Sequence, residues 1–206
     1  MDRLHYHPLS PYSRKAYVAG LMRGEPFERA VIELGSGALQ RPEFLAISPF
    51  GKMPVLETAE GPIIESTSII EHWEDRGPRK LLPAGRELTA RHFDRVGDLY
   101  LVDPVAALWW EAEGETAKNA PQTARRAWRL FEKQLSGRPF VAGDAFSLGD
   151  LGASIATDYF VRLGVEAPAA IRGWCERCFA VPEMKRALEE ALPFVERLHP
   201  SARARA

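Results

Sequence analysis

Hydrophobic and polar positions follow two different patterns along the chain, and the change between them falls near residue 76. Before it, short strand-like stretches alternate with stretches of helical spacing. The strand-like stretches are residues 3–7, 27–34, 55–57 and 62–64, and the helical ones are residues 12–23, 42–47 and 66–75. A Glu60-Gly61 turn joins the last two strands, which predicts an antiparallel hairpin. This order of elements predicts a small α/β domain with a mixed sheet.

The second part of the chain contains no convincing strand. A short polar linker at residues 76–85 precedes it, and a break falls at residues 138–140. Helical spacing covers residues 88–114, 122–135, 148–163, 167–180 and 182–197. We therefore expect an α/β domain at residues 1–77, an all-helical domain at residues 86–206, and a disordered tail at residues 201–206.

Composition narrows the possible functions. The 27 Lys and Arg residues nearly balance the 28 Asp and Glu residues, so charge gives no reason to expect binding to nucleic acid or to an anionic membrane. The N-terminus has no apolar segment of the secretory type, and the apolar stretch of residues 99–110 is broken by Asp103 and Pro104. With only two cysteines a disulfide framework is not expected. The cytoplasm is therefore the expected location.

A proline stands at the start of the third predicted strand, in the run Phe50-Gly51-Lys52-Met53-Pro54-Val55. Proline cannot donate a hydrogen bond to a strand ladder, and an X-Pro bond is the peptide bond in which the cis form costs least. A cis bond here would expose the backbone N–H and C=O of Met53, which could pair with a peptide-like ligand as an added strand does. The alternative is an ordinary trans proline at a strand start.

A second polar pair, Glu65-Ser66, stands where the helix of residues 66–75 begins. The backbone N–H of Ser66 has no partner within such a helix, and the positive end of the helix dipole favours a carboxylate there. Glu65 could bind an ammonium group. The pair therefore suits the zwitterionic end of a small peptide, although a plain N-cap serine beside a surface glutamate is the alternative.

The combination is more specific than either part. The run S-P-F-G-K-M-P, a short hairpin, and then I-E-S at a helix start resembles the N-terminal domain of the glutathione S-transferase family. The resemblance implies a thioredoxin-like N-terminal domain followed by an all-helical C-terminal domain. It also implies a cis-proline at Pro54, backbone pairing of Met53 with the cysteinyl part of glutathione, and binding of the γ-glutamyl end by Glu65 and Ser66.

A second block carries the resemblance into the helical half. The run R-P-F-V-A-G-D, followed by F-S-L-G-D at residues 146–150, resembles a signature of the family's C-terminal domain. Ser147 and Asp150 have the spacing of a capping box, in which each side chain bonds the other residue's backbone N–H. Phe146 and Leu151 are placed to form a hydrophobic staple. We therefore expect Asp150 to act in folding and not in catalysis.

Glutathione chemistry requires the thiolate, because the thiolate is the nucleophile. A hydroxyl that donates a hydrogen bond to sulfur favours this charged form and lowers the pKa of the thiol. The candidate hydroxyls are Ser10, which matches the serine position of the theta- and phi-like classes, Tyr6, whose strand resembles that of alpha-like classes, and Ser13. The run S-P-Y-S at residues 10–13 also resembles the C-P-Y-C turn of glutaredoxins with both cysteines replaced, which argues against dithiol redox chemistry.

The other parts of the ligand site have less distinct signals. Lys52 is the best candidate to bind the glycine carboxylate of glutathione, with Arg41 or Gln40 as helpers, although these groups could simply be exposed. We expect the second-substrate pocket on the helix of residues 99–113, facing Ser10 across a cleft between the domains. The side chains that could line it are Tyr100, Ala107, Trp109 and Trp110, and core packing is the alternative for each aromatic.

The remaining motifs do not indicate a redox or metal site. Cys175-x-x-Cys178 lies inside a helical pattern, so we expect ordinary buried cysteines, and the five histidines show no metal-ligand spacing. The resemblance thus implies a homodimeric transferase that adds glutathione thiolate to a small hydrophobic electrophile, in detoxification or a catabolic step. The alternatives are a non-catalytic binding protein and a glutathione-dependent isomerase, peroxidase or dehalogenase.

Overall fold

The computed structural model describes residues 1–24, 26–78, 80–110 and 114–198. The chain divides into two compact units, one from Met1 to Lys80 and the other from Leu81 onward. The tail of residues 201–206, which the sequence predicts to be disordered, lies outside the described residues.

The first unit is an α/β structure with a four-stranded sheet. Its elements are β1 (Arg3–Tyr6), α1 (Pro11–Arg23), β2 (Glu28–Val31), the 3₁₀ turn η1 (Ala38–Gln40), α2 (Pro42–Leu45), β3 (Val55–Thr58), β4 (Gly61–Ile64) and α3 (Ser66–Glu74). The strand order is β2-β1-β3-β4, with β1 and β2 parallel and the other pairs antiparallel. The predicted mixed sheet and its hairpin are therefore confirmed.

Strand β2 is shorter than the predicted stretch of residues 27–34, because it lies at the edge of the sheet and pairs only with the four residues of β1. One further bond, from the Ile32 N–H to the Tyr6 carbonyl, follows the ladder before the chain leaves it. An edge strand has no second partner that would extend its pairing, so the predicted length was wrong.

Helix α1 has clear signals at both ends. Ser10 is its N-cap and Pro11 occupies the first turn, where the missing N–H of proline costs nothing. Gly24 ends the helix in the left-handed conformation, with φ of 77°, which glycine adopts without a steric penalty. These signals explain why this stretch could be assigned from the sequence.

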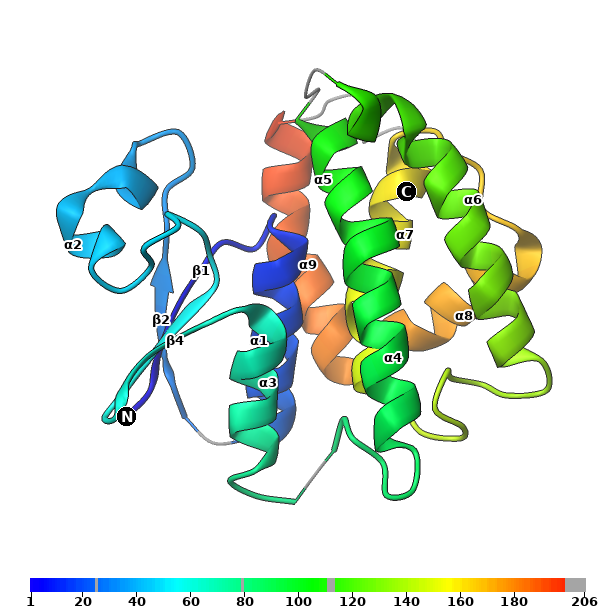
Figure 1. Cartoon of the computed structure of the whole chain (residues 1–206), viewed down its shortest axis with the longest axis horizontal. Coiled ribbons are helices and arrows are strands. Elements are labelled where there is room, and N and C mark those ends of the chain that lie inside the picture. The colour runs from blue at the N-terminus through cyan, green and yellow to red at the C-terminus, as the bar shows by residue number, and fades with distance from the viewer. Residues whose placement is uncertain (25, 79, 111–113, 199–206) are drawn as a thin grey trace. The chain divides into compact units, whose positions relative to one another are not determined.

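Helices α1 and α3 cover one face of the sheet and the η1–α2 segment lies on the other, as Figure 1 shows. On the η1–α2 side, Phe44 of α2 packs with Ile32 and Val55, and Leu39 and Met53 pack against this cluster. The segment between β2 and β3 is thus anchored to the sheet by apolar contacts.

The second unit contains α4 (Glu87–Gly97), the π-helical turn η2 (Asp98–Val102), α5 (Asp103–Trp109), α6 (Glu115–Leu135), α7 (Leu148–Arg162), α8 (Ala169–Phe179) and α9 (Pro182–Leu198). Its elements in the described ranges are helical, and the one β feature among the described residues is a single bridge between Phe140 and Gly143. None of the helices in the described ranges combines the length and the apolar character that a membrane crossing requires.

Two predicted helices of this unit have different limits in the structure. The single helix predicted for residues 88–114 is replaced by α4, η2 and α5, and residues 111–113 of the predicted range lie outside the described residues. Pro104 lacks an N–H and its ring crowds the preceding turn, which accounts for the wide π-helical turn just before it. Gly114, with φ of 126°, is the N-cap of the next helix.

Helix α6 begins at Glu115, seven positions before the predicted start at Gln122. The predicted start was therefore wrong, and Pro121 lies inside the helix. Ala117, Ala120 and Ala124 form a buried apolar row at helical spacing through this point. Packing of that row therefore outweighs the hydrogen bond lost at the proline.

The predicted relation between Ser147 and Asp150 is confirmed, and Asp150 does more than cap α7. Its Oδ2 accepts hydrogen bonds from the backbone N–H of Ser147 at 3.0 Å and from the Ser147 hydroxyl at 2.6 Å. Its Oδ1 accepts from the Val141 N–H at 3.0 Å and from Trp174 Nε1 at 2.8 Å. The carboxylate therefore ties the start of α7 to the preceding loop and to α8.

Candidate functional site

The register of the sheet brings the candidate residues of the first unit to one end of the sheet, where β1, β2 and β4 finish and β3 begins. Tyr6 ends β1 opposite Val31 of the parallel strand β2. On the other side, Val55 at the start of β3 pairs with His5 of β1 and with Ile64 at the end of β4. The segments that leave or enter the sheet here contain the candidate residues Ser10 and Ser13, Gln40 and Arg41, Lys52, Met53 and Pro54, and Glu65 and Ser66. Helices α1 and α3 both begin at this end of the sheet, so the positive ends of two helix dipoles lie there.

Ser10 lies at the N-terminus of α1, and its hydroxyl accepts one hydrogen bond but donates none to the described residues. Its Oγ accepts the Ser13 N–H at 3.2 Å, as an N-cap does, while its own N–H donates to the His7 carbonyl at 3.0 Å. Within the described residues nothing accepts the Ser10 hydroxyl proton. A capping serine uses an oxygen lone pair and keeps its proton, so this hydroxyl can donate to a ligand.

The two rival hydroxyls differ from Ser10 in exposure. Tyr6 is 1% exposed and stacks on Tyr17, with ring centroids 5.0 Å apart. Ser13 is fully buried, and its Oγ has no hydrogen-bond partner among the described residues. Ser10 is half-buried, so it is the one of the three that a ligand in solvent reaches without displacing core side chains.

The peptide bond between Met53 and Pro54 is cis, as the sequence predicted. Met53 lies just before β3, outside the ladder that pairs β3 with β1. Its backbone N–H and C=O make no hydrogen bond to the rest of the described chain. The preceding loop is fixed by Ser48, whose Oγ donates to the Lys52 carbonyl at 2.7 Å and accepts the Lys52 N–H at 3.2 Å. This arrangement suits a ligand that adds as a short strand.

Glu65 and Ser66 form the entry into α3. Glu65 has φ of 71°, the one positive value among the described residues other than glycine, and its exposed carboxylate pairs with no described residue. Ser66 is the first residue of α3, so its N–H has no acceptor within the helix. A non-glycine residue in this backbone region is strained, and such strain is concentrated at functional sites.

The basic and amide candidates are exposed and lie on two neighbouring loops. Gln40 ends η1, and its Nε2 lies 2.7 Å from the position that a β-carbon on Gly51 would occupy. Only glycine fits there, at φ of 59°, and this close approach brings Gln40 beside the residue that precedes Lys52. Arg41 caps α2 and is exposed. The structure thus brings Gln40 and the Lys52 loop together.

The four residues predicted to line the second-substrate pocket belong to the second unit and differ among themselves. Tyr100 in η2 and Trp110 after α5 are exposed, and Ala107 is partly buried. Trp109 is buried and stacks on Tyr159 of α7, with centroids 4.7 Å apart. Trp109 is therefore a core residue of this unit.

Comparison with known proteins shows the family of the chain. Residues 4–80 match the family described as "Glutathione S-transferase, N-terminal domain", and residues 87–182 match "Glutathione S-transferase, C-terminal domain". Glutathione S-transferase 2 of Saccharomyces cerevisiae is 30% identical over 205 residues, which cover 88% of this chain and 87% of the yeast protein. The chain belongs to the glutathione S-transferase family.

A further relative supports the same family, and two solved structures share the fold. Glutathione S-transferase F10 of Arabidopsis thaliana is 29% identical over 171 residues, covering 76% of this chain and 80% of the plant protein. The crystal structure of Gtt2 from Saccharomyces cerevisiae has a TM-score of 0.79 and 24% identity, covering 90% of this chain and 99% of that one. The structure of URE2P6 from Phanerochaete chrysosporium, in complex with oxidized glutathione, has a TM-score of 0.82 and 18% identity, covering 93% and 96%.

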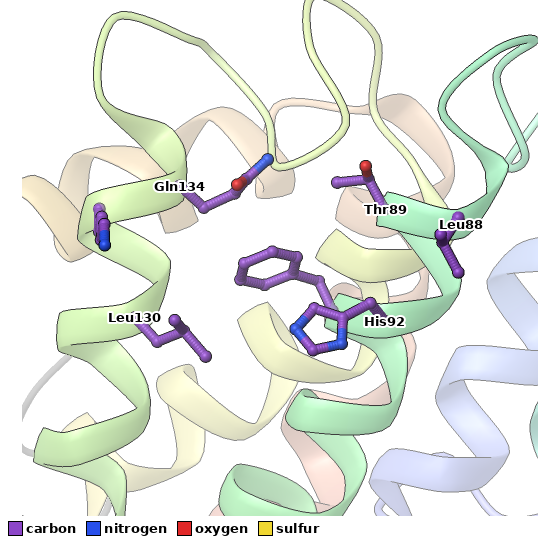
Figure 2. Close-up of a pocket in the computed structure, with 7 residues that line it drawn as sticks. Leu88, Thr89, His92, Leu130 and Gln134 are labelled. Atoms are coloured by element: carbon purple, nitrogen blue, oxygen red, sulfur yellow. The ribbon is translucent and has the colours of Figure 1, made fainter.

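A cavity of about 450 Å³ lies between α4 and α6 in this glutathione S-transferase family member, and none of its lining residues is a predicted site residue. Figure 2 shows His92 and Leu130 pointing into the space between the two helices, with Leu88 and Thr89 on α4 and Gln134 on α6. Leu88 is 81% exposed and Leu130 is 41% exposed. Leu88 and Leu130 thus place apolar surface beside the cavity.

Cys175 and Cys178 lie buried in α8 as free thiols, as the helical pattern indicated. Burial raises the pKa of both thiols well above the ordinary value for cysteine, so neither supplies a thiolate at neutral pH. The described residues contain no group of three or more His, Cys, Asp or Glu side chains with the geometry of a metal site.

Sequence reasoning missed two residues beside the family's glutathione-binding motifs. The side chain of His7 accepts the Leu9 N–H at 3.0 Å through Nδ1, within the loop that leads to Ser10. The buried Lys15 of α1 donates through Nζ to Thr67 Oγ1 at 3.0 Å, next to Ser66 at the start of α3. Neither residue stands in a recognisable motif, so only the folded loop and the packing of α1 on α3 identify them.

Proposed function

We propose that this protein is a glutathione transferase that activates the thiol of glutathione with the Ser10 hydroxyl and adds the thiolate to a small hydrophobic electrophile. The observation that carries the proposal is the state of Ser10. Its Oγ accepts the Ser13 N–H, and its proton has no acceptor in the described part of the chain. The Ser10 side chain is accessible at the end of the sheet where Met53 and Ser66 also lie.

The proposed pose follows from the chemistry of each group. The γ-glutamyl carboxylate meets the N–H of Ser66 at the positive end of α3, and the ammonium group meets Glu65. The cysteinyl backbone pairs with the free N–H and C=O of Met53. Lys52, with Gln40 or Arg41, is the proposed partner of the glycine carboxylate. The sulfur then lies toward Ser10 at the N-terminus of α1.

Two effects would lower the pKa of the bound thiol in this pose. The Ser10 hydroxyl donates a hydrogen bond that favours the charged form, and the α1 dipole favours a negative charge at the same position. A pKa lower by about two units corresponds to about 2.7 kcal/mol of thiolate stabilisation. No nucleophile from the protein is needed, since glutathione supplies the attacking sulfur and the electrophile supplies the leaving group or the double bond.

Retention on glutathione-agarose, followed by conjugation assays with a panel of electrophiles, tests the proposal. The Ser10→Ala variant should still bind glutathione but lose about ten- to a hundredfold in kcat, because a hydrogen bond to a charged group is worth about 1.5–3 kcal/mol. Thermal unfolding must be measured as well, since the change also removes a helix cap.

The matched controls are Ser13→Ala and Tyr6→Phe, which should leave kcat within about twofold, because Ser13 and Tyr6 are buried. Loss of turnover in Tyr6→Phe with normal turnover in Ser10→Ala would show that the tyrosine is the activating group. Glutathione binding without turnover of any electrophile would favour the alternative function, a non-catalytic binding protein of the same family.

We also propose that the protein works in the cytoplasm as a homodimer. The resemblance to the family supports the dimer, and the exposed Leu88 and Leu130 beside the α4–α6 cavity supply apolar surface that a partner would cover.

A further inference from the structure

We propose that His7 is a positioning residue, which holds the loop that presents the Ser10 hydroxyl through a hydrogen bond between its imidazole and the backbone. The inference rests on the proposed function, because it gives His7 a role in activating the same thiol.

The imidazole of His7 has a defined hydrogen-bonding state. Its side chain is buried, and Nδ1 accepts the Leu9 N–H at 3.0 Å. A backbone N–H can only donate, so Nδ1 carries no proton and the ring is the neutral form with its proton on Nε2. The side chain therefore acts as an acceptor inside the loop.

Two further hydrogen bonds hold the same loop, one to the backbone of His7 and one from the side chain of Arg14. The His7 carbonyl accepts the Ser10 N–H at 3.0 Å, which closes a turn over residues 7–10. Arg14 Nε donates to the Pro8 carbonyl at 3.2 Å, which ties the turn to α1. His7 thus takes part in two of the hydrogen bonds that fix the segment between β1 and α1, one through its side chain and one through its carbonyl.

The bond from His7 Nδ1 has the geometry of a known turn. Asn and Asp side chains accept the N–H two residues ahead of them in Asx-turns, and the imidazole nitrogen of His7 makes the equivalent bond to Leu9. The comparison supplies a conservative replacement, because an asparagine oxygen can take the place of Nδ1.

Loss of this turn should displace the Ser10 hydroxyl more than it destabilises α1. A cap between Ser10 and Ser13 is local and can form in several loop conformations. A hydrogen bond from Ser10 to a bound sulfur requires one loop conformation, and a displacement of about 1 Å can cost as much as a hundredfold in rate. Loss of the His7 acceptor should therefore reduce catalysis more than folding.

The test compares His7→Asn with His7→Leu in the full chain. Asparagine and leucine have similar size and branching, both remove the ring, and only asparagine retains an acceptor near the Nδ1 position. The measurements are kcat, KM for glutathione, the thermal midpoint, and the pH midpoint of thiolate absorbance for bound glutathione.

We expect kcat of His7→Leu to be about tenfold lower than that of His7→Asn, because one hydrogen bond separates the two variants. The thiolate midpoint should lie about one pH unit higher in His7→Leu, while KM for glutathione should agree within about twofold. Purely structural damage would lower the thermal midpoint without moving the thiolate midpoint between the two variants.

Equal kcat and equal thiolate midpoints in the two variants would overturn the role of His7, whatever their stability. If the unmodified protein neither binds glutathione nor forms its thiolate, the proposed function itself fails. That failure is visible before any His7 variant is made, so the two outcomes are distinguishable.

Discussion

At the scale of single residues, accessibility and hydrogen bonding separate groups that look equivalent in the sequence. Tyr6, Ser10 and Ser13 lie within eight positions, and each has a hydroxyl. Packing against Tyr17 buries Tyr6, and Ser13 points into the interior, whereas Ser10 remains reachable. The chemistry of a hydroxyl therefore depends here on which neighbours the fold supplies.

The strained backbone of Glu65 gives a prediction at the same scale. Glycine adopts a positive φ more readily than alanine, so Glu65→Gly should be more stable than Glu65→Ala by about 1 kcal/mol in chemical unfolding. Both variants should bind glutathione more weakly than the unmodified protein, because both lack the carboxylate proposed to bind its ammonium group.

The comparison with alanine is the internal control, since the two variants differ only in backbone freedom. Equal unfolding free energies would mean that the backbone at Glu65 is not strained. Unchanged glutathione affinity in both variants would remove Glu65 from the proposed ligand site.

At the scale of elements, the N-terminus of α7 organises the second unit. The capping pair was readable from the spacing of Ser147 and Asp150, but the bonds from Val141 and Trp174 join segments that are distant in the sequence. The helix also approaches its neighbour closely at Gly149, where a β-carbon would lie 2.7 Å from Val141 and 3.0 Å from the Ala90 carbonyl. The element is therefore held by tertiary contacts as much as by its cap.

Asp150→Ala should lower the free energy of unfolding by about 3–5 kcal/mol, more than the ~1 kcal/mol of a simple cap. The change leaves the Val141 N–H, the Ser147 N–H and Trp174 Nε1 buried without their acceptor. Urea denaturation measures this loss. Asp144→Ala, at an exposed aspartate in the same loop, is the control and should stay within about 0.5 kcal/mol. A loss of only ~1 kcal/mol in Asp150→Ala would show that the four-bond network adds nothing to the cap.

At the scale of the whole molecule, the oligomeric state depends on the apolar side chains that the folded chain exposes, and not on local backbone structure. We expect light scattering to give twice the mass of one chain. Leu88→Asp with Leu130→Asp should raise the dimer dissociation constant by about a hundredfold or more, because a two-fold interface contains each leucine twice and each buried leucine contributes about 1.5–3 kcal/mol.

Val31→Asp is the control for this experiment, since Val31 is an exposed apolar residue on the edge strand β2 of the other unit. A dimer that survives the double change at Leu88 and Leu130 would place the interface elsewhere. A monomeric unmodified protein would contradict the homodimer altogether.

The local signals in the sequence were sufficient for most elements. Ser10, Pro11 and Gly24 specify the ends of α1 through backbone chemistry, and the run before Pro54 specified its cis bond through the family resemblance. The limits of β2, of α6 and of the helices around Pro104 could not be predicted, because pairing partners and buried alanine rows decide them.

The sequence by itself determined the family, the two-part architecture and the two backbone motifs at Met53-Pro54 and Glu65-Ser66, since these depend on the order and spacing of residues with special backbone properties. Only the tertiary structure decided which hydroxyl is accessible and that His7 fixes the loop before Ser10. Burial and hydrogen-bond partners arise from segments brought together by folding, and no spacing along a single chain records them.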